Sequence, residues 1–75
     1  MNNVKDIGYI KLFGENLQKI RMSKKMSQET LAYDSDIPIS QVGRIERGEI
    51  NTTISTVKAL SKALNISVKE MFNFE

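Results

Sequence analysis

Residues 27–48 read SQETLAYDSDIPISQVGRIERG, and this stretch decides the fold because it encodes two short helices joined by a tight turn. Ser27 is suited to cap the first helix, since its side-chain oxygen can accept a hydrogen bond from a free backbone N–H. Leu31 and Ala32 then face inward, and polar residues up to Asp36 close the helix after about two turns. Asp36 tolerates the left-handed backbone that such a turn often requires.

The second helix of the pair follows a proline. Pro38 fits the first turn of a helix, where its missing N–H has no partner, and it biases the residue before it toward an extended conformation. We expect this helix to run from Pro38 to Arg47, with Val42 and Ile45 facing inward. Gly48 is placed as the C-terminal glycine that ends it.

Further helices are expected on both sides of this pair. Apolar residues at helical spacing predict an amphipathic helix over residues 8–23, with a face formed by Ile10, Phe13, Leu17 and Ile20. Thr53 can cap another helix that Asn65 ends. The inward face of that helix consists of Val57, Leu60 and Leu64.

The last helix is short. Ser67 and Glu70, three residues apart, form a capping box at its start. Its apolar side consists of Val68, Met71 and Phe72. No strand-like alternation competes, so the sequence predicts an all-α fold, a compact five-helix bundle that contains a helix-turn-helix.

The composition limits the chemistry available to the chain. Its 75 residues include neither cysteine nor histidine, which removes disulfides, thiol and imidazole catalysis and the usual zinc ligands. The scattered carboxylates form no catalytic constellation, so we expect no enzyme activity, no metal and no cofactor. We expect one domain, residues 1–75, with residues 1–7 as a flexible segment. No apolar leader or membrane-length run is present, which predicts a cytoplasmic protein.

Four groups of residues stand out together. They are Ile20-Arg21, Ser27-Gln28-Glu29-x-Leu31-Ala32, Ile45-Glu46-Arg47-Gly48 and the Leu60…Leu64…Ile66 pattern. In this combination residues 10–72 resemble the helix-turn-helix domains of phage Cro and repressor proteins, the XRE family. The resemblance implies a lambda-repressor-like DNA-binding domain. It also implies that Arg21 and Glu46 form an ion pair that ties the first helix to the recognition helix.

The outward face of the third helix carries side chains that suit a major groove, namely Ile39, Ser40, Gln41 and Arg44. Arginine can bind guanine bidentately, glutamine can pair with adenine, serine can bond several base edges and isoleucine can pack on a thymine methyl. The resemblance places base readers at Ile39, Ser40 and Arg44, while Gln41 contacts either a base or a phosphate. Gly43 either allows close approach of the backbone to DNA or is a small residue at a crowded contact.

Two further groups are candidates for phosphate contacts. Ser27 and Gln28 lie where helical N–H groups and the helix dipole favour an anion, and for Ser27 this role is compatible with that of a plain N-cap. The resemblance places the segment after the third helix along the opposite DNA strand, with Arg47, Asn51, Thr52 and Thr53. Asn51 and Thr52 serve equally well as turn residues.

Three residues depart from the family pattern. Lys25 and Asp36 stand where glycine is usual, and Glu49 stands where a basic residue would be more welcome near phosphate. The net charge is only +2, from eleven basic and nine acidic residues, so charge alone argues weakly for nucleic acid. Strong binding by a single copy is therefore not expected.

A second copy of the chain would combine two sets of contacts on half-sites one helical turn apart. The apolar C-terminal residues are the expected dimer interface: Leu64, Ile66, Met71, Phe72 and Phe74. The sequence thus predicts a homodimeric regulator that binds a two-fold symmetric DNA operator and blocks or recruits RNA polymerase. Restriction-modification controllers, phage repressors and antitoxin-type autoregulators all fit this length. The alternative is a protein-interaction module that keeps the fold without binding DNA.

Overall fold

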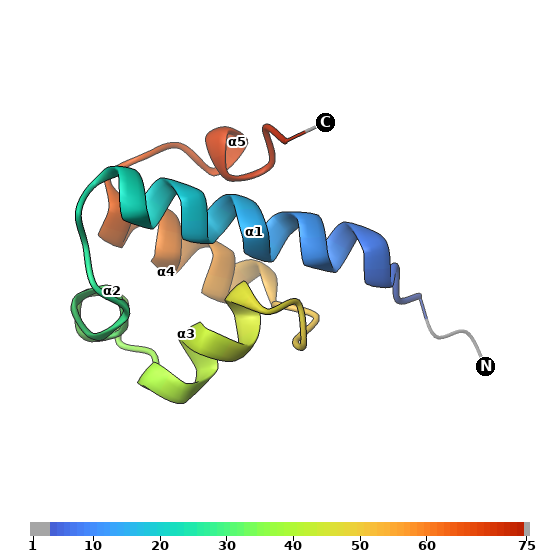
Figure 1. Cartoon of the computed structure of the whole chain (residues 1–75), viewed down its shortest axis with the longest axis horizontal. Helices are drawn as coiled ribbons and strands as arrows, with labels where there is room; N and C mark the ends of the chain where they lie inside the picture. The colour runs from blue at the N-terminus through green and yellow to red at the C-terminus, as the bar shows by residue number, and fades with distance from the viewer. Residues whose placement is uncertain (1–3, 75) are drawn as a thin grey trace.

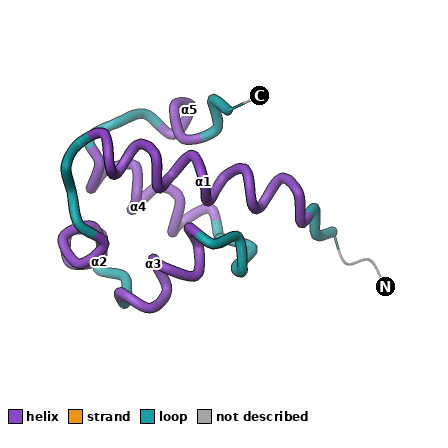
Figure 2. Tube along the Cα trace, viewed as in Figure 1, coloured by secondary structure: helices purple, strands orange, loops and turns teal. Residues whose placement is uncertain are grey.

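The computed structural model describes residues 4–74, and this part of the chain forms five helices. In chain order they are α1 (Ile7–Ser23), α2 (Gln28–Ser35), α3 (Ile39–Glu46), α4 (Ile54–Leu64) and α5 (Val68–Met71). Figure 1 shows α1 running through the middle of the molecule, with α5 on one side and α3 on the other. The tube view shows the loops that connect the helices (Figure 2). This arrangement confirms the predicted all-α, five-helix fold.

The packing of the helices places α3 at one edge of the molecule. Helix α1 contacts α3 and α5, α2 contacts α3 and α4, and α4 contacts α5. Helix α3 is therefore held by its neighbours α1 and α2, and its opposite side is left for contacts outside the chain (Figure 1). Within residues 4–74, no helix is both long and apolar enough to cross a membrane.

Side-chain caps begin four of the helices. Ser27, Thr53 and Ser67 each accept a hydrogen bond from a backbone N–H, as predicted, and Glu70 completes the capping box. Asp6 does the same for α1, accepting from the Tyr9 N–H at 3.0 Å. The expected flexible segment over residues 1–7 is therefore wrong at Asp6 and Ile7, which belong to the helix start. Residues 1–3 lie outside the described residues.

Left-handed residues end the helices. Lys25, Asp36 and Asn65 have φ values of 55°, 59° and 56°, and Gly48 has a φ of 75°. Asp36, Asn65 and Gly48 thus take the stopping roles predicted for them, and Lys25 adopts this conformation without being glycine. Pro38 lies just before α3, at the N-cap, rather than inside its first turn. Proline has no backbone N–H to donate, and the N-cap position does not need one.

The core is formed by the inward faces that the helical periodicity predicts. Its fully enclosed side chains, each at most 1 % exposed, are Leu17, Leu31, Val42, Ile45, Leu60, Leu64 and Met71. Helix α5 departs from the prediction, because only Met71 enters the core. Val68 and Phe72 remain 36 % and 37 % exposed, since a helix of a single turn buries only Met71 fully between its neighbours α1 and α4.

Candidate nucleic-acid interface

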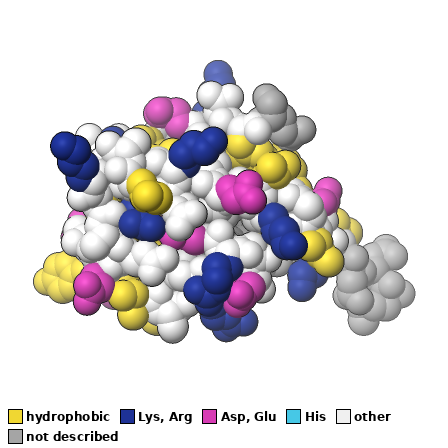
Figure 3. All heavy atoms as spheres, viewed as in Figure 1, with side chains coloured by type: hydrophobic (Ala, Val, Ile, Leu, Met, Phe, Trp, Pro, Cys, Tyr) yellow, Lys and Arg dark blue, Asp and Glu magenta, His cyan; other side chains and the backbone are white. Residues whose placement is uncertain are grey.

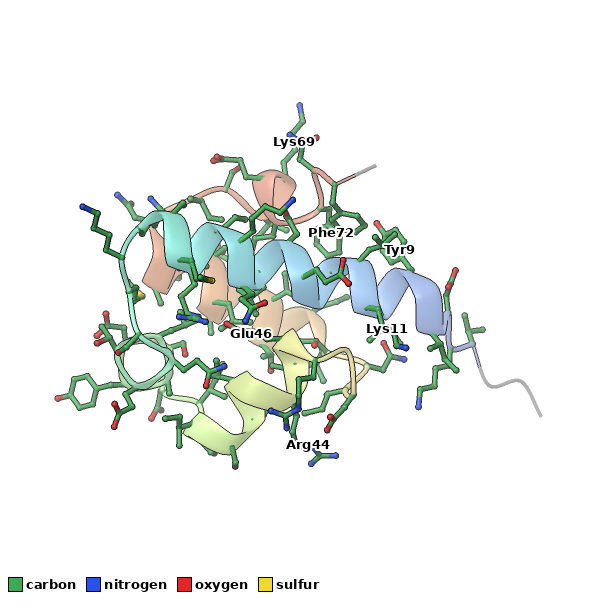
Figure 4. The ribbon with its side chains drawn as sticks, in the orientation of Figure 1. Tyr9, Lys11, Arg44, Glu46, Lys69 and Phe72 are labelled. Carbon is green, nitrogen blue, oxygen red and sulfur yellow. The ribbon has the colours of Figure 1, made fainter. Side chains whose placement is uncertain are left out.

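Helix α3 has one buried face and one open face. Val42 and Ile45 are 0 % and 1 % exposed and anchor the helix to the core. On the open face, Ser40 and Arg44 are exposed, and Ile39 is 47 % exposed. Gln41, the fourth expected reader, is half-buried. In Figure 4, Arg44 points away from α1 at the edge of the molecule, so a donor suited to guanine projects outward.

A buried ion pair joins α1 to the end of α3. The Nε of Arg21 donates to Oε2 of Glu46 at 2.6 Å, and its Nη2 donates to Oε1 at 3.1 Å. Their side chains are only 10 % and 2 % exposed, and Glu46 lies between α1 and α3 in Figure 4. The third guanidinium nitrogen donates to the backbone oxygen of Met26 at 2.8 Å. The pair expected from the family resemblance is thus present, and it fixes the position of α3 against α1.

Helix α2 joins the same network through Gln28. Its Nε2 donates to Oε1 of Glu46 at 2.9 Å, which links α2 directly to α3. One amide hydrogen is used in this bond, and the second remains available for an anion. The hydroxyl of Ser27 accepts from the Thr30 N–H at 3.0 Å. The residues expected at a phosphate are therefore also structural: Ser27 caps α2, and Gln28 supports Glu46.

The segment after α3 holds the other expected phosphate contacts. Asn51 is exposed, whereas the half-buried Thr52 lies within hydrogen-bonding distance of the Ile50 backbone oxygen, at 3.5 Å. The hydroxyl of Thr53 caps α4 through the Thr56 N–H at 3.2 Å. Arg47 donates to a carboxylate oxygen of Glu49 at 2.8 Å. Asn51 is therefore exposed and makes no side-chain hydrogen bond within residues 4–74, whereas the other three expected side chains already have hydrogen bonds within the protein.

Gly43 lies at a crowded contact rather than on the open face. A Cβ atom on Gly43 would lie 3.1 Å from Nη1 of Arg47 and 3.9 Å from Nε2 of Gln28. The residue itself is buried. Of the two interpretations given for this glycine, the structure supports accommodation of neighbouring side chains. Close approach of its backbone to DNA stays a prediction.

Two supporting residues on α1 were missed in the sequence. A Cβ on Gly14 would lie 2.3 Å from the Ile45 carbonyl oxygen, so α1 and the end of α3 touch backbone to backbone there. The amide of Asn16 donates to the carbonyl oxygens of Glu70 and Met71 at 3.2 and 2.8 Å, which fastens α5 to α1. The glycine inside an otherwise regular helix is the sequence signal for the first contact, whereas nothing in the sequence marks Asn16 as buried.

The expected dimer interface is only partly on the surface. Leu64 and Met71 are 1 % and 0 % exposed, so these two predictions are wrong, because both side chains are buried in the core of a single copy. Ile66 and Phe74 are half-buried against the core. Phe72 is more open, and its ring lies 5.0 Å from that of Phe13.

An apolar strip was not predicted as a unit. Ile54 is 89 % exposed at the start of α4, and together with Val68 and Phe72 it lines a depression of about 360 Å³. We call these three residues the apolar strip. The ring of Tyr9 stacks on Phe72 at 6.3 Å and continues the apolar surface toward α1, as Figure 4 shows. Periodicity places Ile54 on the same side as the buried Val57, but in the first turn of α4 this side projects beyond the core.

Comparison with known proteins identifies the family. The helix-turn-helix family HTH_3 matches residues 17–71, which covers α2, α3, α4 and α5 entirely. The chain belongs to this family. Members of the helix-turn-helix family are DNA-binding transcriptional regulators of bacteria and phages, not enzymes. The open face of α3 and its buried support are thus parts of a DNA-binding regulator.

The most similar relatives of this helix-turn-helix chain include control proteins. The control protein C.BamHI of Bacillus amyloliquefaciens is 39 % identical over 64 residues, which are 84 % of this chain and 79 % of the relative. The control protein C.SmaI of Serratia marcescens is 40 % identical over 60 residues, covering 80 % and 71 %. The crystal structure of the restriction-modification controller protein C.AhdI from Aeromonas hydrophila superposes with a TM-score of 0.85 at 38 % identity, covering 87 % and 98 %. The regulator is thus of the controller-protein type.

Proposed function

We propose that this regulator binds a two-fold symmetric DNA operator in a sequence-specific manner, as a homodimer. The observation that carries the proposal is the open face of α3 on a rigid support. The face offers Arg44 and Ser40, while the Arg21–Glu46 pair holds the helix from beneath. A helix fixed in this way enters a major groove without first losing conformational freedom, which preserves affinity.

Each outward side chain has a role on the bases. Arg44 binds O6 and N7 of a guanine, and Ile39 packs on a thymine methyl. Ser40 contacts a base edge near the start of α3. Gln41 is half-buried, and its amide contacts either a base or a phosphate. These contacts specify the sequence, because each base pair presents its own pattern in the major groove.

Contacts to phosphate position the helix. The free amide hydrogen of Gln28 and the N-terminal end of α2 face one DNA strand. Asn51, exposed in the loop before α4, donates to the other strand. Such contacts fix register and orientation, and they carry no sequence information themselves.

The apolar strip serves as the contact with a second copy. In a two-fold dimer the same patch lies on both subunits, and Ile54, Val68 and Phe72 present such a patch. An isoleucine that is 89 % exposed gains free energy when another copy covers it. The strip begins directly after Thr53, close to the loop that faces DNA. We expect pairing through the strip to bring two copies of α3 to neighbouring half-sites.

Occupation of the operator regulates transcription in the cytoplasm, by excluding or recruiting RNA polymerase. The relatives named above are control proteins, and one is a restriction-modification controller. This similarity supports restriction-modification genes as the regulated system for this chain as well.

Selection of bound duplexes from a random DNA pool at near-physiological salt tests the proposal. We expect a two-fold symmetric motif, and we expect sedimentation to show a dimer at the same protein concentration. Arg44→Lys is the matched control, because it keeps the charge but loses the bidentate fork. It should retain binding to random DNA and lose selection at one base pair in each half-site. Recovery of no motif would favour the protein-interaction module instead.

A further inference from the structure

A carboxylate lies between the two arginines at the end of α3. Oε2 of Glu49 accepts a hydrogen bond from Nε of Arg47 at 2.8 Å, whereas Oε1 lies 3.7 Å from Nε of Arg44. The first distance is that of a strong hydrogen bond, and the second is only a charge contact. Figure 3 shows acidic and basic side chains side by side at the lower edge of the molecule, where α3 lies. Glu49 thus holds Arg47 and merely attracts Arg44.

The backbone fixes Glu49 in this position. Gly48 adopts a φ of 75° after the end of α3, and its N–H donates to the Ile45 oxygen at 3.0 Å. The N–H of Glu49 donates to the Arg44 oxygen at 2.9 Å. These two bonds form a Schellman motif, which sets where the Glu49 side chain starts relative to α3. The arrangement therefore follows from the fold rather than from a chance meeting of two long side chains.

Arg47 also rests on the surface of α3. A Cβ on Gly43 would lie 3.1 Å from Nη1 of Arg47, so the guanidinium occupies space that a larger residue would need. Its Nε is bonded to Glu49 at the same time. This bond lowers the pKa of the Glu49 carboxyl and raises the pKa of Arg47, so both groups stay charged near neutral pH. Arg47 thus has protein contacts at both ends of its guanidinium group.

Given the DNA-binding function proposed above, we propose that Glu49 is a specificity-determining residue, which withholds Arg47 from DNA phosphates while leaving Arg44 free to turn to a base. In the specific complex, Arg44 exchanges a 3.7 Å contact for two hydrogen bonds to guanine. The Arg47–Glu49 pair stays closed.

Glu49 lowers the affinity of the protein for random DNA. Such binding comes almost entirely from basic side chains that neutralise phosphates. For Arg47 to contribute, it must break a 2.8 Å hydrogen bond and leave a bare carboxylate facing the DNA. In the operator complex the base contacts of Arg44 and Ser40 fix α3 in one register that does not require Arg47 to meet a phosphate, whereas random binding uses every cation that can reach the backbone. Glu49 therefore lowers non-specific affinity more than operator affinity. Because the net charge of the chain is only +2, one arginine withheld from DNA is a large fraction of the excess positive charge.

Glu49→Gln tests this proposal. Dissociation constants are measured for the selected operator and for a random duplex between about 50 and about 200 mM salt. For random DNA we expect the slope of log K against log salt to steepen by about 0.9 for each Arg47 that gains a phosphate. With equal affinities of variant and wild type at about 1 M salt, this change corresponds to roughly eightfold tighter binding of the variant at about 0.1 M salt. Operator affinity should rise less, so the ratio of specific to random binding falls.

Two controls separate the pairing from net charge. Glu15→Gln makes the same charge change on α1, at an exposed residue outside the ion pairs of the described residues, and should leave the random-DNA slope unchanged. The double variant Glu49→Gln with Arg47→Gln should restore the wild-type slope, because the freed cation is gone.

Three results would overturn the inference. They are equal gains on operator and random DNA, a gain from Glu15→Gln as large as that from Glu49→Gln, and a steeper slope that persists in the double variant. Failure of the wild-type protein to prefer any sequence would instead overturn the proposed function. The wild-type titration alone distinguishes that case.

Discussion

Replacing Gly14 with alanine is expected to destabilise the domain, although alanine is the better helix former. Gly14 lies where α1 crosses the end of α3, and an added Cβ would lie 2.3 Å from the carbonyl oxygen of Ile45 and 2.7 Å from that of Glu46. Ordinary Cβ contacts begin at 3.4 Å, so the two helices must separate by about 1.1 Å. Since the opposing atoms are backbone, no rotamer change relieves the overlap.

The magnitude follows from two opposing effects. Overpacking costs about 1–3 kcal/mol, and a backbone clash belongs at the upper end of that range. Helix propensity returns up to about 1 kcal/mol, so we expect a net loss of about 2 kcal/mol in the free energy of unfolding. For a domain of this size, the melting temperature falls by about 8–16 °C. Thermal and urea unfolding, followed by circular dichroism, measure both quantities.

Gly8 offers a matched control in the same helix. A Cβ there would meet Oδ1 of Asp6 at 3.6 Å, an ordinary contact, so Gly8→Ala should be neutral or stabilise by up to about 1 kcal/mol. If Gly14→Ala were as stable as Gly8→Ala, the close crossing of α1 and α3 would be refuted.

The remaining predictions concern the ion pair, the DNA face and the apolar strip. Glu46→Gln should lower the free energy of unfolding by about 3 kcal/mol in urea titrations, because it leaves the buried Arg21 guanidinium without a charged partner; a near-neutral result would contradict the burial of the pair. In titrations against operators with single base changes, Arg44→Ala should lose about 1–3 kcal/mol of specific affinity and relax selection at one base pair, whereas Gln28→Ala should weaken all sequences alike. Identical profiles for the two variants would show that the roles are not divided in this way. Ile54→Ser should shift sedimentation toward monomer while changing the unfolding free energy by no more than about 0.5 kcal/mol, and a persistent dimer would place the interface elsewhere.

The helices could be predicted from the sequence because local rules determine where they begin and end. Ser27, Thr53 and Ser67 cap their helices through side-chain oxygens that act within three residues. Gly48 and Asn65 stop theirs by adopting a conformation that few other residues adopt easily. Interactions that span so few residues can be recognised in the sequence alone.

The surface could be predicted less well, because burial depends on elements distant in the chain. Periodicity shows that Leu64 and Met71 lie on apolar faces, but it does not show whether a helix of the same copy or a second copy covers them. In the structure α4 and α5 pack on each other, which buries both residues. Asn16 bonds to carbonyl groups 54 and 55 residues away, beyond any pattern of spacing. Glu49 stood out as unfavourable for DNA, but its bond to Arg47 depends on the chain reversal at Gly48.

The support of α3 and its reading face are made of different residues. Val42, Ile45 and Glu46 hold the helix from inside, while Ser40 and Arg44 project outward and contribute nothing to the core. Exchanges on the outward face should therefore leave stability almost unchanged, within about 0.5 kcal/mol each. Descendants of this protein can therefore acquire new target sequences through single substitutions, and each intermediate protein still folds. Regulators and their operators can diverge together without an unstable intermediate.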